Sequence, residues 1–242
     1  MRKTLFTLAA LCAAYGGVAA APAFAADDEA PAEEEKADGP ITISGGVTLA
    51  SDYRFRGVSL NGKDFAVQPT LTIKHESGLY AGVWGSNISE NPGSDVEVDL
   101  FAGFAGGDTV TYDIGATYYL YPGFSAANYV ELTGKLGTSI GPLTVGGQLS
   151  YVPSQDNTGN NDNVYVAGNA SVGIPNTPVT LNATLGYEDG AFANKKVDWS
   201  VGASASFSGF TLGAAYVDAN RNSTFVFKDT KATVVFTLGY AF

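Results

Sequence analysis

Lys231-Ala-Thr-Val-Val-Phe-Thr-Leu-Gly-Tyr-Ala-Phe242 is the stretch that decides the fold, because its large apolar side chains alternate with smaller ones. The large side chains share one parity: Val234, Phe236, Leu238, Tyr240 and Phe242. A period of two residues places alternate side chains on opposite faces of an extended strand. The pattern therefore predicts a β-strand with one large apolar face and one face of small side chains.

This strand runs to an aromatic residue, Phe242. Alternating hydrophobic residues that end in Phe resemble the closing strand of bacterial outer-membrane β-barrels. The resemblance implies that the outer-membrane assembly machinery is a partner through this strand. An amphipathic strand in a soluble sandwich has the same pattern, so the other strands must distinguish the two folds.

The composition favours a barrel that faces lipid. Charged residues make up only 15% of the chain, while Gly numbers 30, Tyr 13 and Phe 14. After the first 25 residues no apolar run approaches the ~18 residues that a transmembrane helix requires. Little charge, many Gly and aromatic residues, and alternation instead of long runs are typical of transmembrane β-barrels.

The first 25 residues have the pattern of a signal peptide. Arg2 and Lys3 supply a positive start, an apolar stretch follows over 5–21, and Ala23-Phe24-Ala25 fits a cleavage site. Cys12, the chain's one cysteine, lies in this segment. We therefore expect no disulfide and no thiol site in the mature chain.

Residues 26–40 are predicted to be a disordered, periplasmic acidic linker, with seven acidic side chains against Lys36 alone. Tether, docking site and mobile occluder of the pore are all open roles for it. Without residues 1–40 the chain keeps 17 of its 24 acidic and 10 of its 13 basic side chains. This acidity argues against a nucleic-acid partner.

The two-residue period recurs through residues 41–242 and predicts twelve strands. They are Ile41–Arg56, Phe65–Lys74, Leu79–Ser86, Val96–Phe104, Val110–Leu120, Asn128–Thr138, Leu143–Tyr151, Val164–Ile174, Val179–Tyr187, Val197–Phe207, Phe210–Asp218 and Ala232–Phe242. Connections after odd-numbered strands are long and polar, and those after even-numbered strands are short. The predicted fold is a single twelve-stranded antiparallel transmembrane β-barrel with short periplasmic turns and longer extracellular loops.

Outward aromatic side chains are predicted near both ends of the strands, where the two membrane interfaces would lie. The girdle at the loop ends is Phe55, Phe65, Tyr151, Tyr187, Trp199 and Tyr216. The girdle at the turn ends is Phe104, Tyr112, Phe207, Phe210, Tyr240 and Phe242. Outer-membrane lipid is thus an expected partner, and the expected location is the outer membrane of a bacterial cell.

Four segments carry a resemblance to a known family: Ser51–Ser59, Gln68-Pro69, His75–Asn87 and Glu97–Asp99. They resemble the TorF family of porins over about the first half of the barrel, and the remainder matches mainly in pattern. The resemblance implies a pore. It implies no particular solute and no catalytic residues.

The opposite parity is predicted to line the lumen. Its charged members are Asp52, Arg54, Arg56, Lys74, Glu97, Asp99, Asp113, Glu131 and Lys135. Five of them lie toward the loop side: Arg54, Arg56, Glu97, Asp99 and Glu131. These five would form either an electrostatic filter for solutes or ion pairs across a narrow lumen, and we favour pairing because opposite charges come within reach of one another. Its aromatic members are Tyr80, Trp84, Phe101, Tyr119, Tyr121, Tyr129 and Tyr165. These would either stack on a solute or simply narrow the interior.

Strand number and side-chain size predict a narrow, water-filled pore without a plug. Eight-stranded barrels are filled by side chains and ~16–18 strands leave a channel, so twelve lie between. The predicted function is passive diffusion of small hydrophilic solutes, with a weak preference for cations. A non-conducting structural or adhesive barrel acting through its extracellular loops is the alternative.

An enzyme is the third class considered. The single histidine, His75, falls in a predicted short turn without an accompanying serine and acid. Residues 156–163 are rich in oxygen ligands but lack the spacing of a calcium loop. We therefore predict no catalysis, no cofactor and no metal site.

Overall fold

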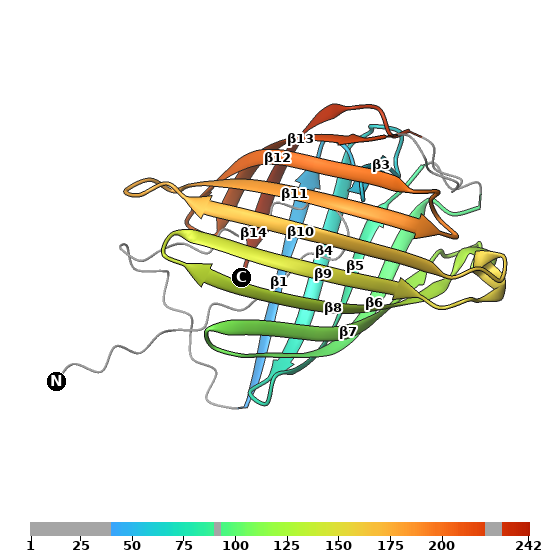
Figure 1. The fold of residues 1–242 in the computed structure, drawn as a ribbon, viewed down its shortest axis with the longest axis horizontal. Coiled ribbons are helices and arrows are strands. Elements are labelled where there is room, and N and C mark those ends of the chain that lie inside the picture. Colours follow the sequence, from blue (N-terminus) through green and yellow to red (C-terminus); the bar gives the residue numbers. More distant parts are fainter. Residues whose placement is uncertain (1–39, 90–92, 221–228) are drawn as a thin grey trace.

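Twelve antiparallel strands close into a barrel in the computed structural model, which describes residues 40–89, 93–220 and 229–242 (Figure 1). The strands of the barrel are β1 (Ile41–Ala50), β4 (Ala66–His75), β5 (Leu79–Asn87), β6 (Val96–Gly106), β7 (Val110–Leu120), β8 (Tyr129–Ile140), β9 (Leu143–Val152), β10 (Asn163–Gly173), β11 (Val179–Gly190), β12 (Lys196–Phe207), β13 (Phe210–Ala219) and β14 (Thr233–Ala241). The fold class expected from the sequence is confirmed. The predicted signal peptide, 1–25, and residues 26–39 of the predicted linker lie outside the described residues.

Each strand pairs with its neighbours in chain order, and β1 closes the ring. It pairs with β4 from Ile41↔His75 to Ala50↔Ala66 and with β14 from Gly46↔Ala241 to Ala50↔Thr237. The N–H of Phe242 also donates to the carbonyl of Gly45 at 3.0 Å. Closure removes the sheet edges, whose backbone groups would otherwise be unpaired.

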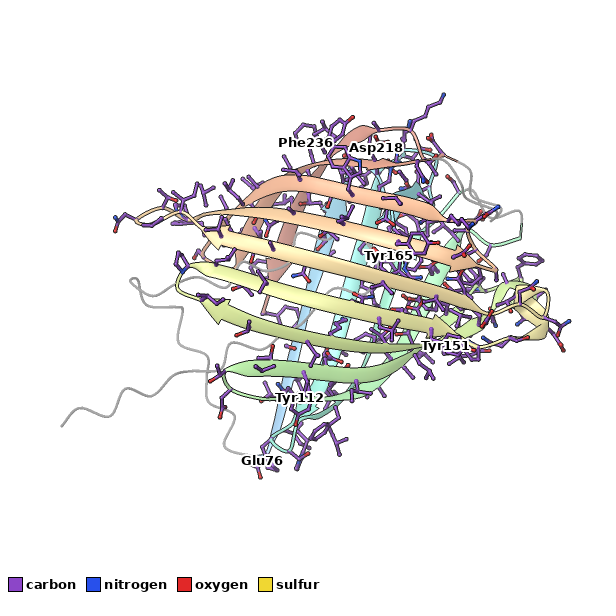
Figure 2. All side chains as sticks on the ribbon, in the orientation of Figure 1. Glu76, Tyr112, Tyr151, Tyr165, Asp218 and Phe236 are labelled. Atoms are coloured by element: carbon purple, nitrogen blue, oxygen red, sulfur yellow. The ribbon has the colours of Figure 1, made fainter. Side chains whose placement is uncertain are left out.

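The outer surface is built from the large apolar parity. Ile114, Leu212 and Phe236 are 61–65% exposed, and Figure 2 shows Phe236 and Tyr112 projecting from the barrel. The inner parity carries the buried charges, such as Glu97, which is 1% exposed. The alternation read from the sequence therefore has the predicted direction, with apolar side chains outside and polar ones inside.

The barrel has a loop-side end and a turn-side end. Longer connections, including that after β9 with the 3₁₀ helix η2 (Asp156–Thr158), lie at the loop-side end, on the right of Figure 1. Another 3₁₀ helix, η1 (Ser125–Ala127), follows β7. The loop 191–195 is an exception in length, because it is no longer than the turn 174–178.

The first connection differs most from the prediction. The strand expected over Ile41–Arg56 ends at Ala50, and a small hairpin follows, formed by β2 (Arg54–Phe55) and β3 (Val58–Ser59). Arg56 and Gly57 at its tip have φ of +49° and +82°. Two successive positive φ values are the mark of a tight two-residue hairpin turn, which ends the extended pattern.

The structure contains no helix, within the residues that it describes, that is long and apolar enough to cross a membrane.

Candidate functional site

Residues 51–61, which we call the inward hairpin, fold into the lumen at the loop-side end. Nine of these eleven residues are buried: Asp52, Tyr53, Arg54, Arg56, Gly57, Val58, Ser59, Leu60 and Asn61. A Cβ atom built on Gly57 would lie 2.9 Å from the Cβ atoms of Asp198 on β12 and Ala219 on β13. The backbone at the hairpin tip thus touches the wall two and three strands round the ring from β1, so the hairpin is folded into the barrel.

Arg56 at the hairpin tip joins two strands of the wall. Its Nη2 lies 2.7 and 2.6 Å from the two carboxylate oxygens of Glu131 on β8, and its Nη1 lies 2.8 Å from Glu188 Oε1 on β11. All three side chains are 3% exposed. Its guanidinium also lies 4.2 Å from the ring centroid of Tyr165. The contacts of 2.6–2.8 Å with Glu131 and Glu188 are charge-assisted hydrogen bonds, which are stronger than bonds between neutral groups.

Lys196 extends this network. Its Nζ lies 2.8 Å from Glu188 Oε2 and 3.8 Å from Asp198 Oδ2, and it donates a hydrogen bond to the backbone carbonyl of Arg56. Asn163 Nδ2 donates to Glu188 Oε1 at 3.0 Å. The tip is therefore held through both the side chain and the backbone of Arg56.

The base of the hairpin is fixed by a second set of contacts. Arg54 Nε pairs with Asp52 at 2.6 Å, and the Asp52 carboxylate also accepts a bond from Ser59 Oγ at 2.6 Å. Ser59 N–H donates to the carbonyl of Asp229 at 2.9 Å, and Lys63 Nζ lies 3.1 Å from the Asp229 carboxylate. Burial acts to raise the pKa of Asp229, but the bonds from Lys63 and from the Lys231 N–H outweigh it and hold that pKa below its usual range.

Aromatic side chains fill the space beside the hairpin. Tyr53 Oη donates to Glu97 Oε1 at 2.6 Å, and its ring lies 5.3 Å from that of Trp84. Tyr119 and Tyr129 stack with centroids 4.4 Å apart, and Phe55 meets the edge of Tyr119 at 6.0 Å. Between hairpin and wall remains a cavity of about 30 Å³, which is room for about two water molecules.

The turn-side half of the lumen is different. Tyr80 Oη donates to Asp113 Oδ1 at 2.7 Å, and Asp113 lies opposite Lys135 in the sheet register. Lys74, Tyr80 and Lys135 are half-buried there. The inward glycines Gly82 and Gly103 leave room for the rings of Phe101 and Tyr80, with which a Cβ atom at either position would collide.

A family model for a bacterial protein of unknown function, Gcw_chp, matches residues 34–242. The chain belongs to the Gcw_chp family. No curated protein matches this member of the family.

Solved structures of porins resemble this Gcw_chp chain in fold. The KdgM porin matches with a TM-score of 0.56 and 9% identity, over 82% of this chain and 98% of KdgM. The NanC porin matches with a TM-score of 0.53 and 14% identity, over 83% of this chain and 99% of NanC. KdgM has also been solved in complex with disordered oligogalacturonate, with a TM-score of 0.55 to this chain. At these identities the likeness shows the fold alone. The porin-like barrel is confirmed, and membership of the TorF family stays a prediction.

The charged residues predicted to line the lumen of the Gcw_chp barrel all lie inside it, although Asp52, Arg54 and Arg56 belong to the hairpin and not to a wall strand. Arg56 and Glu131 form an ion pair across the lumen, as the pairing interpretation expected. Glu97 and Asp99 lie together on β6. Lys74 lies apart from these groups, near the turn-side end.

The predicted lumen aromatics also lie on the inner face: Tyr80, Trp84, Phe101, Tyr119, Tyr121, Tyr129 and Tyr165 are buried or half-buried. Ring contacts connect Tyr80 with Phe101, at 6.3 Å, and Tyr119 with Tyr129. These rings pack on one another, on the hairpin and on inward carboxylates, and thus narrow the lumen.

Eleven of the twelve predicted girdle residues are exposed on the outside: Phe65, Tyr151, Tyr187, Trp199, Tyr216, Phe104, Tyr112, Phe207, Phe210, Tyr240 and Phe242. Phe55 contradicts the prediction, because it lies on β2 inside the barrel and packs on Tyr119. The physical reason is that β1 ends at Ala50, so the parity of the outer wall no longer applies to Phe55.

The prediction of an unplugged, water-filled pore does not hold for the loop-side half, where the inward hairpin occupies the lumen. Residues 57–64 were expected to form an external loop. Instead Val58, Leu60 and Tyr53 join one buried apolar cluster with wall residues such as Tyr129. Burying these side chains inside the barrel removes apolar surface from water, which an external loop would leave exposed.

Sequence reasoning missed Glu188, Lys196 and Asp198. It placed Glu188 and Lys196 in an external loop, whereas β11 extends to Gly190 and β12 begins at Lys196. Asp198 lies in the predicted strand Val197–Phe207 but was not singled out. Glu188 lies directly opposite Lys196 in the register. The signal was present, because opposite charges at inward positions stabilise a cross-strand pair.

His75 is the exposed last residue of β4, at the start of the turn to β5. Its Nδ1 lies 2.8 Å from Ser77 Oγ and accepts the Ser77 backbone N–H at 3.1 Å. These are local contacts of a turn, and among the described residues no carboxylate contacts the imidazole. Nor do the described residues contain a group of three or more His, Cys, Asp or Glu side chains arranged to hold a metal ion.

Proposed function

We propose that the protein is an outer-membrane channel through which small hydrophilic solutes diffuse passively, with the inward hairpin as its constriction. The observation that carries the proposal is the reversal of polarity across one wall. Leu100 is 47% exposed on the outer face of β6, whereas Asp99 beside it is 1% exposed on the inner face. Such a wall is suited to hydrocarbon on its outer side and to an aqueous path on its inner side.

The exposed aromatic side chains support the same orientation. Trp199 and Tyr216 pair at 5.2 Å near the loop-side end, and Phe210 and Tyr240 pair at 4.8 Å near the turn-side end. We infer that these rows lie at the two membrane interfaces, with the turns in the periplasm and the loops outside. Strand β14, which closes the ring against β1, is then the segment that we expect the assembly machinery to recognise.

A non-conducting structural barrel is the second candidate, and one observation favours it. The hairpin leaves a cavity of only about 30 Å³ beside it in the loop-side half. In that case the barrel would act through its outer loops, and the hairpin would be a permanent closure.

Single-channel recording in planar bilayers tests the proposal. We expect the wild-type barrel to conduct weakly, and a variant with residues 52–61 replaced by a short Gly-Ser linker to conduct severalfold more, because the constriction sets the resistance. Conduction by the variant alone would support the closed structural barrel. Absence of current from both, in a preparation that folds, would overturn the channel proposal.

A further inference from the structure

Carboxylates and cations are unequal in number in the loop-side half of the lumen. Six carboxylate side chains are buried there against three cationic ones: Asp52, Glu97, Asp99, Glu131, Glu188 and Asp198 against Arg54, Arg56 and Lys196. The three cations pair with Asp52, with Glu131 and Glu188, and with Glu188 and Asp198 respectively. Two carboxylates on β6, Glu97 and Asp99, therefore have no ion-pair partner among the described residues.

Asp99 is the more isolated of the two. It is 1% exposed, and no described group donates a hydrogen bond to its Oδ1. Glu97, two residues away on the same inner face, is also 1% exposed; it accepts a bond from Tyr53 at 2.6 Å and interacts with the Tyr121 hydroxyl. Two neighbouring buried carboxylates repel each other and have lost their water, so both cannot be ionised without a compensating positive charge.

A neutral oxygen ligand lies on the next strand. Thr117 on β7 is 1% exposed, and its Oγ1 has no hydrogen-bond partner among the described residues. The register places Thr117 opposite Phe101 on one side and Glu131 on the other, so its inward side chain is the diagonal neighbour of Asp99. A buried hydroxyl without a partner is rare in native proteins and points to a group that binds it.

We propose that Glu97, Asp99 and the Thr117 hydroxyl form a binding site for one divalent, oxygen-preferring cation such as Ca²⁺. Two carboxylates balance a double charge, and oxygen atoms are the ligands that Ca²⁺ takes. With two carboxylates and one hydroxyl from the protein, water completes the coordination. Such a site belongs to the weak class, with a dissociation constant on the order of 10⁻⁴–10⁻³ M.

The ion would also hold the hairpin in place. Glu97 already accepts the hydroxyl of Tyr53 from the inward hairpin, so a cation that fixes the Glu97 carboxylate fixes that contact too. The inference deepens the proposed function, because it adds divalent cations to the species that bind inside the barrel. The cation site rests on the placement of the hairpin in the barrel. Cation binding can be measured without any ion flow.

Terbium luminescence on the full chain in detergent micelles tests the site. Tb³⁺ takes the same oxygen ligands as Ca²⁺, and excitation of Tyr53 or Trp84 beside the carboxylates sensitises its emission. We expect saturable Tb³⁺ emission at pH 7 that Ca²⁺ displaces. Asp99→Asn and Glu97→Gln are each expected to weaken binding at least about tenfold, since each removes one of two charges.

Asp113→Asn is the matched control, because Asp113 is an inward carboxylate of the turn-side half that Tyr80 already bonds. It should bind Tb³⁺ as the wild type does. Equal emission from wild type, Asp99→Asn and Glu97→Gln would overturn the proposal, since the ion would then bind elsewhere, for instance at the acidic residues 26–40. Absence of displaceable emission from folded wild type would also overturn it and would mean that protons neutralise the pair.

Glu97→Gln keeps the proposal testable if Asp99→Asn does not fold, because the glutamine carbonyl can still accept the Tyr53 hydroxyl. Single-channel recording of the same proteins separates this inference from the channel proposal. Conduction without specific Tb³⁺ binding would overturn the cation site alone. Specific binding without conduction would leave the site intact and contradict the channel.

Discussion

The loop-side and turn-side halves of the lumen are built from the same twelve strands, yet among the described residues only the loop-side half holds an inserted segment. In the loop-side half the hairpin side chains Tyr53 and Arg54 are 1% exposed, and they pack between charged and aromatic wall residues. In the turn-side half Lys74 and Lys135 are half-buried among small side chains. The difference comes from one segment that leaves β1 and turns inward.

This contrast shows that the number of strands alone does not determine what occupies the interior of a barrel. Twelve strands enclose a lumen of intermediate width, and either water or protein can occupy it. Here two kinds of contact favour protein at one end, the ion pairs of Arg56 and the apolar packing of Val58 and Leu60. At the other end the described residues insert no segment into the lumen, and Tyr80 bonds the inward carboxylate of Asp113 instead.

Removal of Arg56 should have the largest effect on this contrast. Arg56→Ala leaves the Glu131 and Glu188 carboxylates buried without that cation, and breaking a buried ion pair costs about 3–5 kcal/mol. We expect the hairpin to leave the lumen, so that its amide hydrogens exchange faster and the loop-side half resembles the turn-side half. Hydrogen exchange followed by mass spectrometry measures this.

Lys74→Ala is the control for Arg56→Ala, since Lys74 is an inward cation of the turn-side half with no ion pair in the structure as described. It should leave exchange in residues 51–61 unchanged. Unchanged exchange in Arg56→Ala as well would mean that the apolar packing and the remaining polar contacts of the hairpin are enough to hold it.

Gly57→Ala tests the fit of the hairpin tip against the wall. Gly57 has φ of +82°, and an added Cβ would meet the Cβ atoms of Asp198 and Ala219 at 2.9 Å. Backbone strain contributes about 1–2 kcal/mol, and the collision adds to it. We expect a lower melting temperature and faster exchange in the hairpin.

Gly141→Ala isolates the contact from the strain. Gly141 has φ of +60° in a turn-side connection, and a Cβ there would meet nothing within 4 Å. It should show the cost of strain alone and leave the hairpin protected. Equal losses of stability in the two variants would mean that Gly57 is needed only for its backbone conformation.

Protonation of Asp229 in acid should have the smallest effect. The pKa of Asp229 lies below its usual range, so its stabilising contact with Lys63 is complete above the ordinary aspartate pKa of about 4 and is lost as the pH falls through the lowered value. The pair is partly exposed, so its contribution is about 0.2–1 kcal/mol. The observable is a small rise in hairpin exchange in acid.

Asp229→Asn should show that higher exchange already at neutral pH and respond less to acid. The Ser59 N–H bond to the Asp229 carbonyl remains in this variant, so the base of the hairpin should stay attached. An acid response as large as that of the wild type would assign the effect to other carboxylates.

The period of two residues was sufficient to predict the barrel, eleven of the twelve strands to within a few residues, and the outward position of side chains such as Trp199. Local alternation carries this information because each strand meets apolar surroundings on one face and polar surroundings on the other. It failed at strand ends that carry charged side chains, because such residues are also typical of loops. Glu188 and Lys196 read as loop residues although they are paired inside the wall.

The hairpin could not be predicted, because its position depends on partners far away in the chain. Arg56 follows a stretch that alternates like a strand, and its binding partners lie 75 and 132 residues further on. Only the closed barrel brings Glu131 and Glu188 to the same point of the lumen. Alternation between lipid-facing and inward side chains is a local property of the chain, whereas filling the lumen depends on the joint geometry of several strands.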